Sequence, residues 1–203
     1  MKSSYLKTIL LEILAILAIF TFISYSPLDT GITKFRAKSK KLSLNDVVLM
    51  LKKYDFSDAL SYQSGKGFEN HFELKVIEGD TVVIDHSSGL MWQRGGSSQK
   101  MKYKAVARWI KDINKKGFAG YKDWRLPTLE EAMSLVEPEK QNGLYIDPIF
   151  NKKQEIILTC DGIKKDKLLN PNWMVELYAG ACINFSPDGS YVRAVRTVQL
   201  LKD

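Results

Sequence analysis

Cysteine and histidine are scarce in this chain, with two of each among 203 residues. Cys160 and Cys182 form no C-x-x-C motif, so the sequence carries no signature of a zinc ribbon or a redox site. His71 and His86 lack the spacing of metal ligands, and no metal site is predicted. We also find no internal repeat and no low-complexity tract. These absences leave a chain with few chemically reactive side chains.

The composition is that of a globular protein. Hydrophobic residues make up 45% of the chain and charged residues 26%. The length suffices for one domain with a proper core and a short extra segment. Lysine and arginine number 30 against 23 acidic residues, which gives a net charge of +7. This excess weakly favours polyanions or an anionic membrane as partners.

The N-terminus contains an apolar run. Lys2 and Lys7 precede residues 9–25, which are apolar or weakly polar except for Glu12. A spanning helix needs about 20 apolar residues and the apolar core of a signal peptide about 7–15. No A-x-A-like cleavage site follows, so we expect residues 1–25 to be an uncleaved membrane anchor rather than a cleaved signal. A buried core helix is the alternative.

Three further segments follow. Residues 26–42 are polar and basic and are predicted to be a linker. Residues 43–72 are predicted to be a helical lead-in, with Ser43 and Asp46 as a capping box. The apolar face of that helix is predicted from an i, i+3, i+4, i+7 pattern, formed by Leu44, Val47, Val48 and Leu51. Residues 73–203 are predicted to be the main domain.

The main domain alternates between strand and helix patterns. Strands are expected from residue 74 to 93, with turns at Gly79–Asp80 and at residues 85–89. Helices are expected at residues 103–116 and 129–136. The expected strands of the tail are residues 156–159, 173–178, 182–185 and 191–196. This order predicts an α+β fold with two helices packed on short antiparallel sheets.

The stretch GYKDWRLPTLEEAMSL has an elaborate helix start. Thr128 and Glu131 form a second capping box, and Pro127 keeps the preceding backbone extended. Trp124 offers a large surface to bury, and Arg125 offers a rigid fork of donors that can tie loops to carbonyls or a carboxylate. No nucleophile with a plausible base is present. We therefore interpret the stretch as a structural lock rather than a catalytic element.

Residues 191–196 alternate as a strand would. Each face mixes charged with apolar residues, so Arg193 and Arg196 are expected to be buried and paired with acids from loops. The candidate partners are Asp123, Glu130 and Glu131.

The helix predicted at residues 103–116 has a basic face. The four residues of this face, which we call the basic stripe, are Lys104, Arg108, Lys111 and Lys115. At 100° per residue they lie opposite the apolar residues Val106, Trp109, Ile110 and Ile113. The stripe suits a polyanion such as a sulfated glycan, teichoic acid or lipopolysaccharide, and an ordinary solvated face is the simpler interpretation. Nucleic acid is not expected, because the aromatic residues of the helix lie on its apolar side.

Five motifs, in this order and spacing, resemble one bacterial family. They are DHSSGLMWQR at residues 85–94, AVARWIKDINKKGFAGYKDWRLPTLEEAMSL at 105–135, YIDPIF at 145–150, WMVEL at 173–177 and YVRAVR at 191–196. They are similar to the family typified by the C-terminal domain of the Legionella collagen-like adhesin, over about residues 74–199. Besides the residues already named, the motifs contain Asp85, Gly89, Trp92 and Trp173. Residues 157–160 depart from the aromatic-rich strand of many relatives, which puts ligand contacts by that strand in doubt.

The resemblance implies a C-type-lectin-like fold related to formylglycine-generating enzymes, and a place at the bacterial surface or envelope. It also implies adhesion and the binding of sulfated polysaccharides. The basic residues of the linker would by themselves keep the domain in the cytoplasm. The family context instead favours a single-pass inner-membrane anchor with the domain in the periplasm or outside the cell.

Cys160 and Cys182 do not lie in a motif like the reactive cysteine pair of formylglycine-generating enzymes. We expect them in the core on neighbouring strands, or as a disulfide if the domain is exported. The chain is thus predicted to be a membrane-anchored, non-enzymatic binding or adhesion module. A degenerate formylglycine-generating-type enzyme and a structural protein-interaction module are the alternatives. No cofactor is predicted, and calcium dependence is left open.

Overall fold

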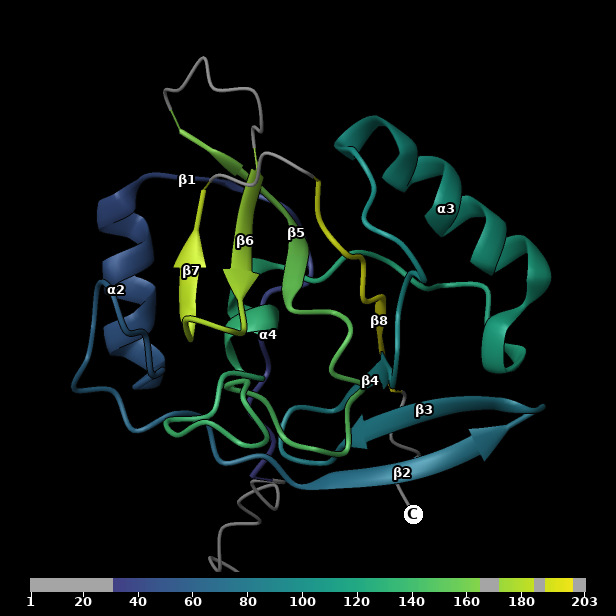
Figure 1. Cartoon of the computed structure of the whole chain (residues 1–203), viewed down its shortest axis with the longest axis horizontal. Coiled ribbons are helices and arrows are strands. Elements are labelled where there is room, and N and C mark those ends of the chain that lie inside the picture. Colours follow the sequence, from purple (N-terminus) through teal and green to yellow (C-terminus); the bar gives the residue numbers. More distant parts are fainter. Residues whose placement is uncertain (1–30, 165–171, 185–188, 199–203) are drawn as a thin grey trace, which may run out of the picture. The chain divides into compact units, whose positions relative to one another are not determined.

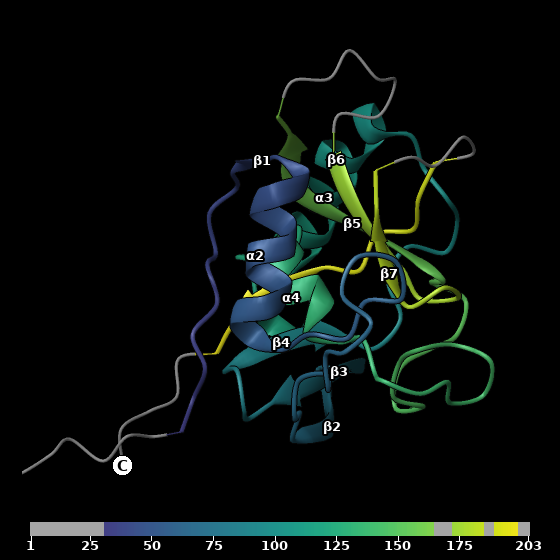
Figure 2. The same cartoon turned by 90° about the vertical axis from the view of Figure 1, so that its left-hand side faces the viewer.

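The computed structural model describes residues 31–164, 172–184 and 189–198. From Ile32 onward they belong to one compact unit, shown from two sides in Figures 1 and 2. It contains two four-stranded sheets and short helices, so the predicted α+β class is confirmed. The elements are β1 (Lys41–Leu42), α2 (Leu44–Tyr54), β2 (Phe72–Ile77), β3 (Asp80–Asp85), β4 (Leu90–Gln93), α3 (Tyr103–Lys116), η1 (Phe118–Gly120), α4 (Leu129–Met133), β5 (Ile156–Ile163), β6 (Asn172–Glu176), β7 (Ala181–Ile183) and β8 (Val195–Thr197).

One sheet is antiparallel throughout, in the order β2-β3-β4-β8. Its first hairpin turns at Glu78–Gly79, because Ile77 pairs with Asp80. This is one residue earlier than predicted. Both turn residues have positive φ, 50° and 86°, as a two-residue type I′ turn requires, and glycine adopts the second without strain.

The other sheet has the order β1-β5-β6-β7. Strand β1 runs parallel to β5, so the prediction of purely antiparallel sheets is wrong at this edge. The remaining pairs are antiparallel. The parallel strand comes from residues 41 and 42, which were predicted to lie in the linker.

The segment before β1 is part of the compact unit, contrary to the predicted linker boundary. Thr33 donates its backbone N–H to the carbonyl of Ser87 at 2.8 Å, and the side chain of Leu42 is buried. Arg36 makes the ion pairs described below. The helical lead-in likewise shares its core with the main domain rather than forming a separate unit.

Helix α2 begins as predicted, with Ser43 and Asp46 in a capping box. Its inward face is rotated from the predicted one, because Met50 is buried whereas Leu44 is 62% exposed. Val47 and Leu51 are buried as expected. The predicted helical period was therefore right, but its first apolar residue lies at the solvent edge.

Helix α3 bridges the two sheets on the side away from the main core, which is the hydrophobic cluster that includes Phe56, Trp92 and Leu135. Alternate residues of β5 face opposite ways, so Ile157 joins the main core while Leu158 packs beside Val106 of α3. Trp109 and Ile110 contact both this cluster and the outer face of the other sheet. The predicted apolar stripe thus anchors α3 along its length.

Two later elements are shorter than predicted. Helix α4 ends at Met133 instead of Val136, because Leu135 and Val136 donate to carbonyls only three residues back, as in a 3₁₀ turn. Of residues 191–196, only the last two belong to strand β8. In the residues before them, a side chain takes the place of a strand partner as hydrogen-bond acceptor, since Ser97 Oγ accepts from the backbone N–H of Val192 at 3.0 Å.

The predicted membrane helix in residues 1–25 lies outside the described residues. Within the described ranges no helix is long and apolar enough to cross a bilayer.

Candidate functional site

Helix α4 starts with the predicted capping box. Thr128 Oγ1 accepts from Glu131 N at 3.3 Å, and Glu131 Oε2 accepts from Thr128 N at 2.9 Å. Thr128 Oγ1 also donates to the carbonyl of Arg36 at 2.9 Å. The cap therefore joins the helix start to the segment before β1.

Arg125 holds the same glutamate from outside the helix. Its two terminal nitrogens donate to the two carboxylate oxygens of Glu131, each at 2.7 Å. The Glu131 side chain is only 1% exposed. Burial by itself would lower the pKa of Arg125, but the hydrogen bonds and charge of Glu131 raise it. Arg125 thus ties its loop to a carboxylate, as its predicted role required.

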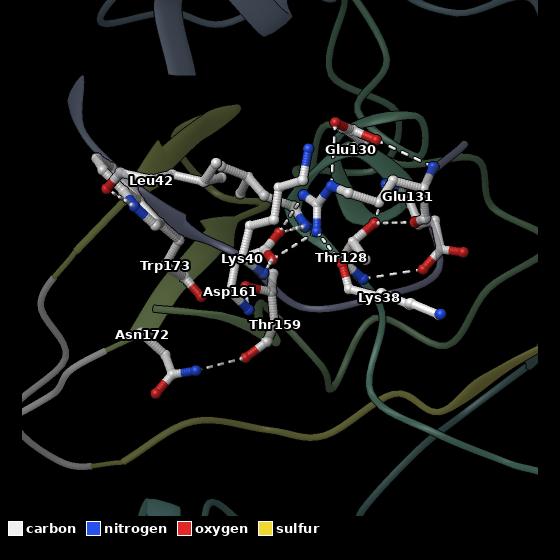
Figure 3. A network of polar contacts seen from close by, with 12 residues as sticks. Lys38, Lys40, Leu42, Thr128, Glu130, Glu131, Thr159, Asp161, Asn172 and Trp173 are labelled. Carbon is white, nitrogen blue, oxygen red and sulfur yellow. Dashed lines mark hydrogen bonds and ion pairs between the residues drawn. The ribbon is translucent and has the colours of Figure 1, made fainter. Parts of the chain in front are cut away.

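A second fork lies beside the first. Arg36 donates to both oxygens of Asp161 at 2.7 Å, and Asp161 also accepts from the backbone N–H groups of Lys40 and Leu129 at 2.7 Å (Figure 3). Arg36 further contacts Glu130 at 3.4 Å. Burial lowers the pKa of Arg36, but Asp161 and then Glu130 outweigh burial and raise it. One buried carboxylate therefore joins the segment before β1, the start of α4 and strand β5.

Three tryptophan side chains are buried in or near this region. Trp124 is 2% exposed, donates its ring N–H to the carbonyl of Phe118 at 2.9 Å and packs edge-on against that ring. Trp173 donates to the carbonyl of Leu42 at 3.1 Å. Trp92 is fully buried in the main core. These tryptophans serve packing.

Asp85 and Gly89 build the turn between β3 and β4. Asp85 is buried and accepts from the backbone of His71 at 3.1 Å and of Ser87 at 3.0 Å, and from the hydroxyl of Ser88. Gly89 has φ +67°, a conformation that side chains disfavour. Both residues have structural roles.

The basic stripe lies apart from this network. All four of its side chains are exposed on α3, as predicted. None of the salt bridges found among the described residues includes a member of the stripe. Asp112 is the single acidic residue of α3, and the last turn adds Lys116. Within the described residues the stripe is therefore a positive surface without salt bridges, on a firmly anchored helix.

A scan against protein families matches residues 81–196 to the Lcl C-terminal domain. This chain belongs to that family. Comparison with curated proteins and comparison with solved structures gave no match. The match confirms the resemblance drawn from the five motifs.

The matched range of the Lcl C-terminal domain holds both capping partners, Arg125, Asp161 and the whole of α3. It does not include Arg36, although Arg36 completes the network around Asp161. Neither Arg36 nor Asp161 is predicted from the sequence to be a site residue. The only signal was an arginine inside a basic run, which is also typical of a linker.

The two arginines of the final motif behave differently. Arg196 pairs with Asp123, one of its three candidate partners, at 2.7 Å, and lies 3.7 Å from the ring centre of Tyr121. Hydrogen bonds from Arg196 hold the pKa of Asp123 below its usual value, with burial opposing them. This half of the prediction is confirmed.

Arg193 has no acidic partner among the described residues, which contradicts the prediction. It donates to the carbonyls of Gln93 at 3.0 Å and Asn151 at 3.1 Å, and to that of Arg94, beneath the ring of Phe150. Burial lowers its pKa to about 9, which leaves it charged at neutral pH. Carbonyl dipoles and an aromatic face take the place of a carboxylate.

Both cysteines are free thiols, so the disulfide considered from the sequence does not form in this structure. Cys160 lies on β5 and Cys182 on β7, with β6 between them, rather than on neighbouring strands. Burial raises the pKa of Cys160 to about 12, and burial and then Asp58 raise that of Cys182 further. Neither thiol is activated as a nucleophile.

A hollow lies at the N-terminal end of α3, beside Tyr103, Asn172 and Met174. Its cavity volume is about 10 Å³, roughly the room that one water molecule needs. Small-molecule sites usually enclose ~300–1000 Å³, so this hollow is too small to be one.

In the described ranges, no group of three or more His, Cys, Asp or Glu side chains could hold a metal ion.

Proposed function

We propose that this Lcl C-terminal domain protein is a non-enzymatic, adhesin-type binding module whose basic stripe binds an anionic envelope or extracellular polymer, such as a sulfated polysaccharide. The observation that carries the proposal is the stripe itself. Its members, Lys104, Arg108, Lys111 and Lys115, are exposed and form no salt bridge with another described residue, and they lie on one side of a helix whose other side is packed.

The geometry of α3 favours a polymer over a single small anion. The stripe runs over eleven helical steps, which correspond to about 16 Å at 1.5 Å per residue. A single sulfate or carboxylate would contact one or two of these side chains. A linear polyanion can contact all four, and each contact releases a counterion.

The chemistry around α4 supports binding rather than catalysis. Asp161 and Glu131 are engaged by arginine forks, and both thiols have raised pKa values. A degenerate formylglycine-generating-type enzyme would need a reactive thiol. No observation favours it, and none specifically favours a purely structural protein-interaction module.

We also propose that the fold is C-type-lectin-like and that residues 1–25 anchor the domain in the inner membrane with the domain outside the cytoplasm. The two small sheets with α3 against them are compatible with the first idea. The apolar N-terminal run and the family context support the second.

The polymer proposal is tested with heparin as the probe. The variant Lys104→Ala, Arg108→Ala, Lys111→Ala, Lys115→Ala is compared with a control that loses four exposed lysines elsewhere, at positions 52, 66, 152 and 153. Both variants lose four positive charges. We expect the stripe variant alone to elute at much lower salt, and its log–log salt slope to fall by about 3–4. Equal elution of the two variants would show that only net charge matters.

A further inference from the structure

Strand β2 presents an open edge. In the described part of the chain it pairs with β3 on one side only. It is the outermost ribbon along the lower margin of Figure 1. Leu74 and Val76 on this strand are 45% and 69% exposed, which is unusual for large apolar side chains in a six-residue strand. An open apolar edge is a template for pairing with another strand.

The register shows which backbone groups are free. Ile77 pairs with Asp80 across a two-residue turn, so the backbone groups of Ile77 point toward β3. The direction alternates along an antiparallel pair, so the N–H and C=O groups of Phe72, Leu74 and Val76 point away from the sheet. The hydrogen bond from His86 N to His71 O, at 2.9 Å, follows the same alternation.

We propose that β2 pairs with β2 of a second copy of this chain, antiparallel about a twofold axis at Leu74. In this register Leu74 faces the partner's Leu74, and Val76 faces the partner's Phe72. All three of these β2 residues are among those with outward backbone groups, so the pairing uses the free donors and acceptors. A twofold interface must be self-complementary, and this strand meets that condition.

Charge selects the register. With the axis at Leu74, Glu73 faces the partner's Lys75, and Lys75 faces the partner's Glu73. Moving the axis by one residue would oppose two glutamates or two lysines, which is unfavourable, and would also direct the wrong backbone groups at the partner. A lysine in an edge strand ordinarily discourages pairing. In β2 the negative charge of Glu73, two residues earlier, compensates the positive charge of Lys75.

The interface is small. One six-residue strand from each copy covers less than the ~1200–2000 Å² of a standard interface, so the dimer belongs to the weak class. Anchoring two copies in one membrane would raise their effective concentration. The pairing is independent of the polyanion proposal, because α3 takes no part in it.

Cross-linking tests the register. In the full chain, Leu74→Cys places two thiols across the axis on Cα atoms about 5.5 Å apart, within disulfide range. Val76→Cys, the matched control, places its two Cα atoms four residues apart along the strands, about 13 Å. We expect diamide to give a disulfide dimer with Leu74→Cys and little with Val76→Cys on a non-reducing gel. Equal cross-linking of both, or none with Leu74→Cys, overturns the proposal.

The second test exchanges the charges of Glu73 and Lys75. Sedimentation of the full chain at rising concentration measures how strongly each variant dimerises. Glu73→Lys and Lys75→Glu should each weaken dimerisation at least tenfold, because each opposes like charges. The double variant Glu73→Lys, Lys75→Glu should restore it. A double variant as weak as the singles would overturn the register. Monomer throughout in the wild type would overturn the proposal.

Discussion

Asp161 is the acceptor on which three segments converge, and Asp161→Asn removes its charge while keeping its size. The carboxylate serves two guanidinium N–H groups and two backbone N–H groups. An asparagine oxygen can accept about half of these, and its NH₂ group would face the remaining donors. Arg36, whose side chain is 13% exposed, would then keep its longer contact to Glu130 and its hydrogen bond to the carbonyl of Lys38.

The size of the effect follows from that geometry. Breaking a buried ion pair by removing one partner costs about 3–5 kcal/mol. Arg36 is partly exposed and Glu130 remains at 3.4 Å, so we expect the lower end, about 3 kcal/mol. For a domain of this size that corresponds to a fall in Tm of about 6–12 °C.

Urea denaturation followed by circular dichroism measures the effect. Arg36→Met should destabilise to a similar extent, and the double variant should lose clearly less than the two single losses combined. Glu155→Gln, at an exposed ion pair outside β2, is the control and should leave the urea midpoint unchanged. If Asp161→Asn unfolds within about 1 kcal/mol of the wild type, the network does not hold the three segments together.

Three further predictions follow from single side chains. Trp124→Ala should destabilise the fold by about 3–5 kcal/mol and Thr128→Ala by about 1 kcal/mol in urea titrations, because one loses a buried ring and the other a cap. Burial raises the pKa of Glu137, so its charged form opposes folding above that pKa, and the penalty disappears as pH falls below the unfolded value near 4.3. Glu137→Gln should therefore raise the melting temperature at pH 7 but not at pH 4. Cys160 and Cys182 should resist iodoacetamide at pH 8 in the folded protein. After unfolding, mass spectrometry should count two labels per chain. An unfolded chain without any label would indicate a disulfide.

Local signals made much of the fold predictable. Helix α3 has the predicted bounds, because its apolar period, its basic last turn and Gly117 act within the helix itself. Both capping boxes formed for the same reason, since Ser43 and Thr128 reach backbone groups only three residues away. The exposure of the basic stripe followed directly from helical spacing.

Long-range pairing was not predictable in the same way. Arg36 and Asp161 lie 125 residues apart, and no local pattern relates them. Arg36 sits in a polar, basic run whose composition predicts a linker, whereas its burial depends on a carboxylate from β5. For Arg193 an acidic partner is predicted from the sequence, whereas its guanidinium group donates to backbone carbonyls, which no sequence pattern indicates.

The boundary of the folding unit follows from the same contacts. A fragment that began at residue 81, where the family match begins, would lack α2 and half of the β2–β3 hairpin. A fragment from residue 43 would keep α2 but lose Arg36 and β1, leaving Asp161 without its guanidinium partner and β5 without its parallel neighbour. Because a buried carboxylate without its partner strongly destabilises a fold, residues from 32 onward are needed for a stable domain. A fragment from residue 32 should therefore melt well above one from residue 43, and equal melting would show that the segment before β1 is dispensable.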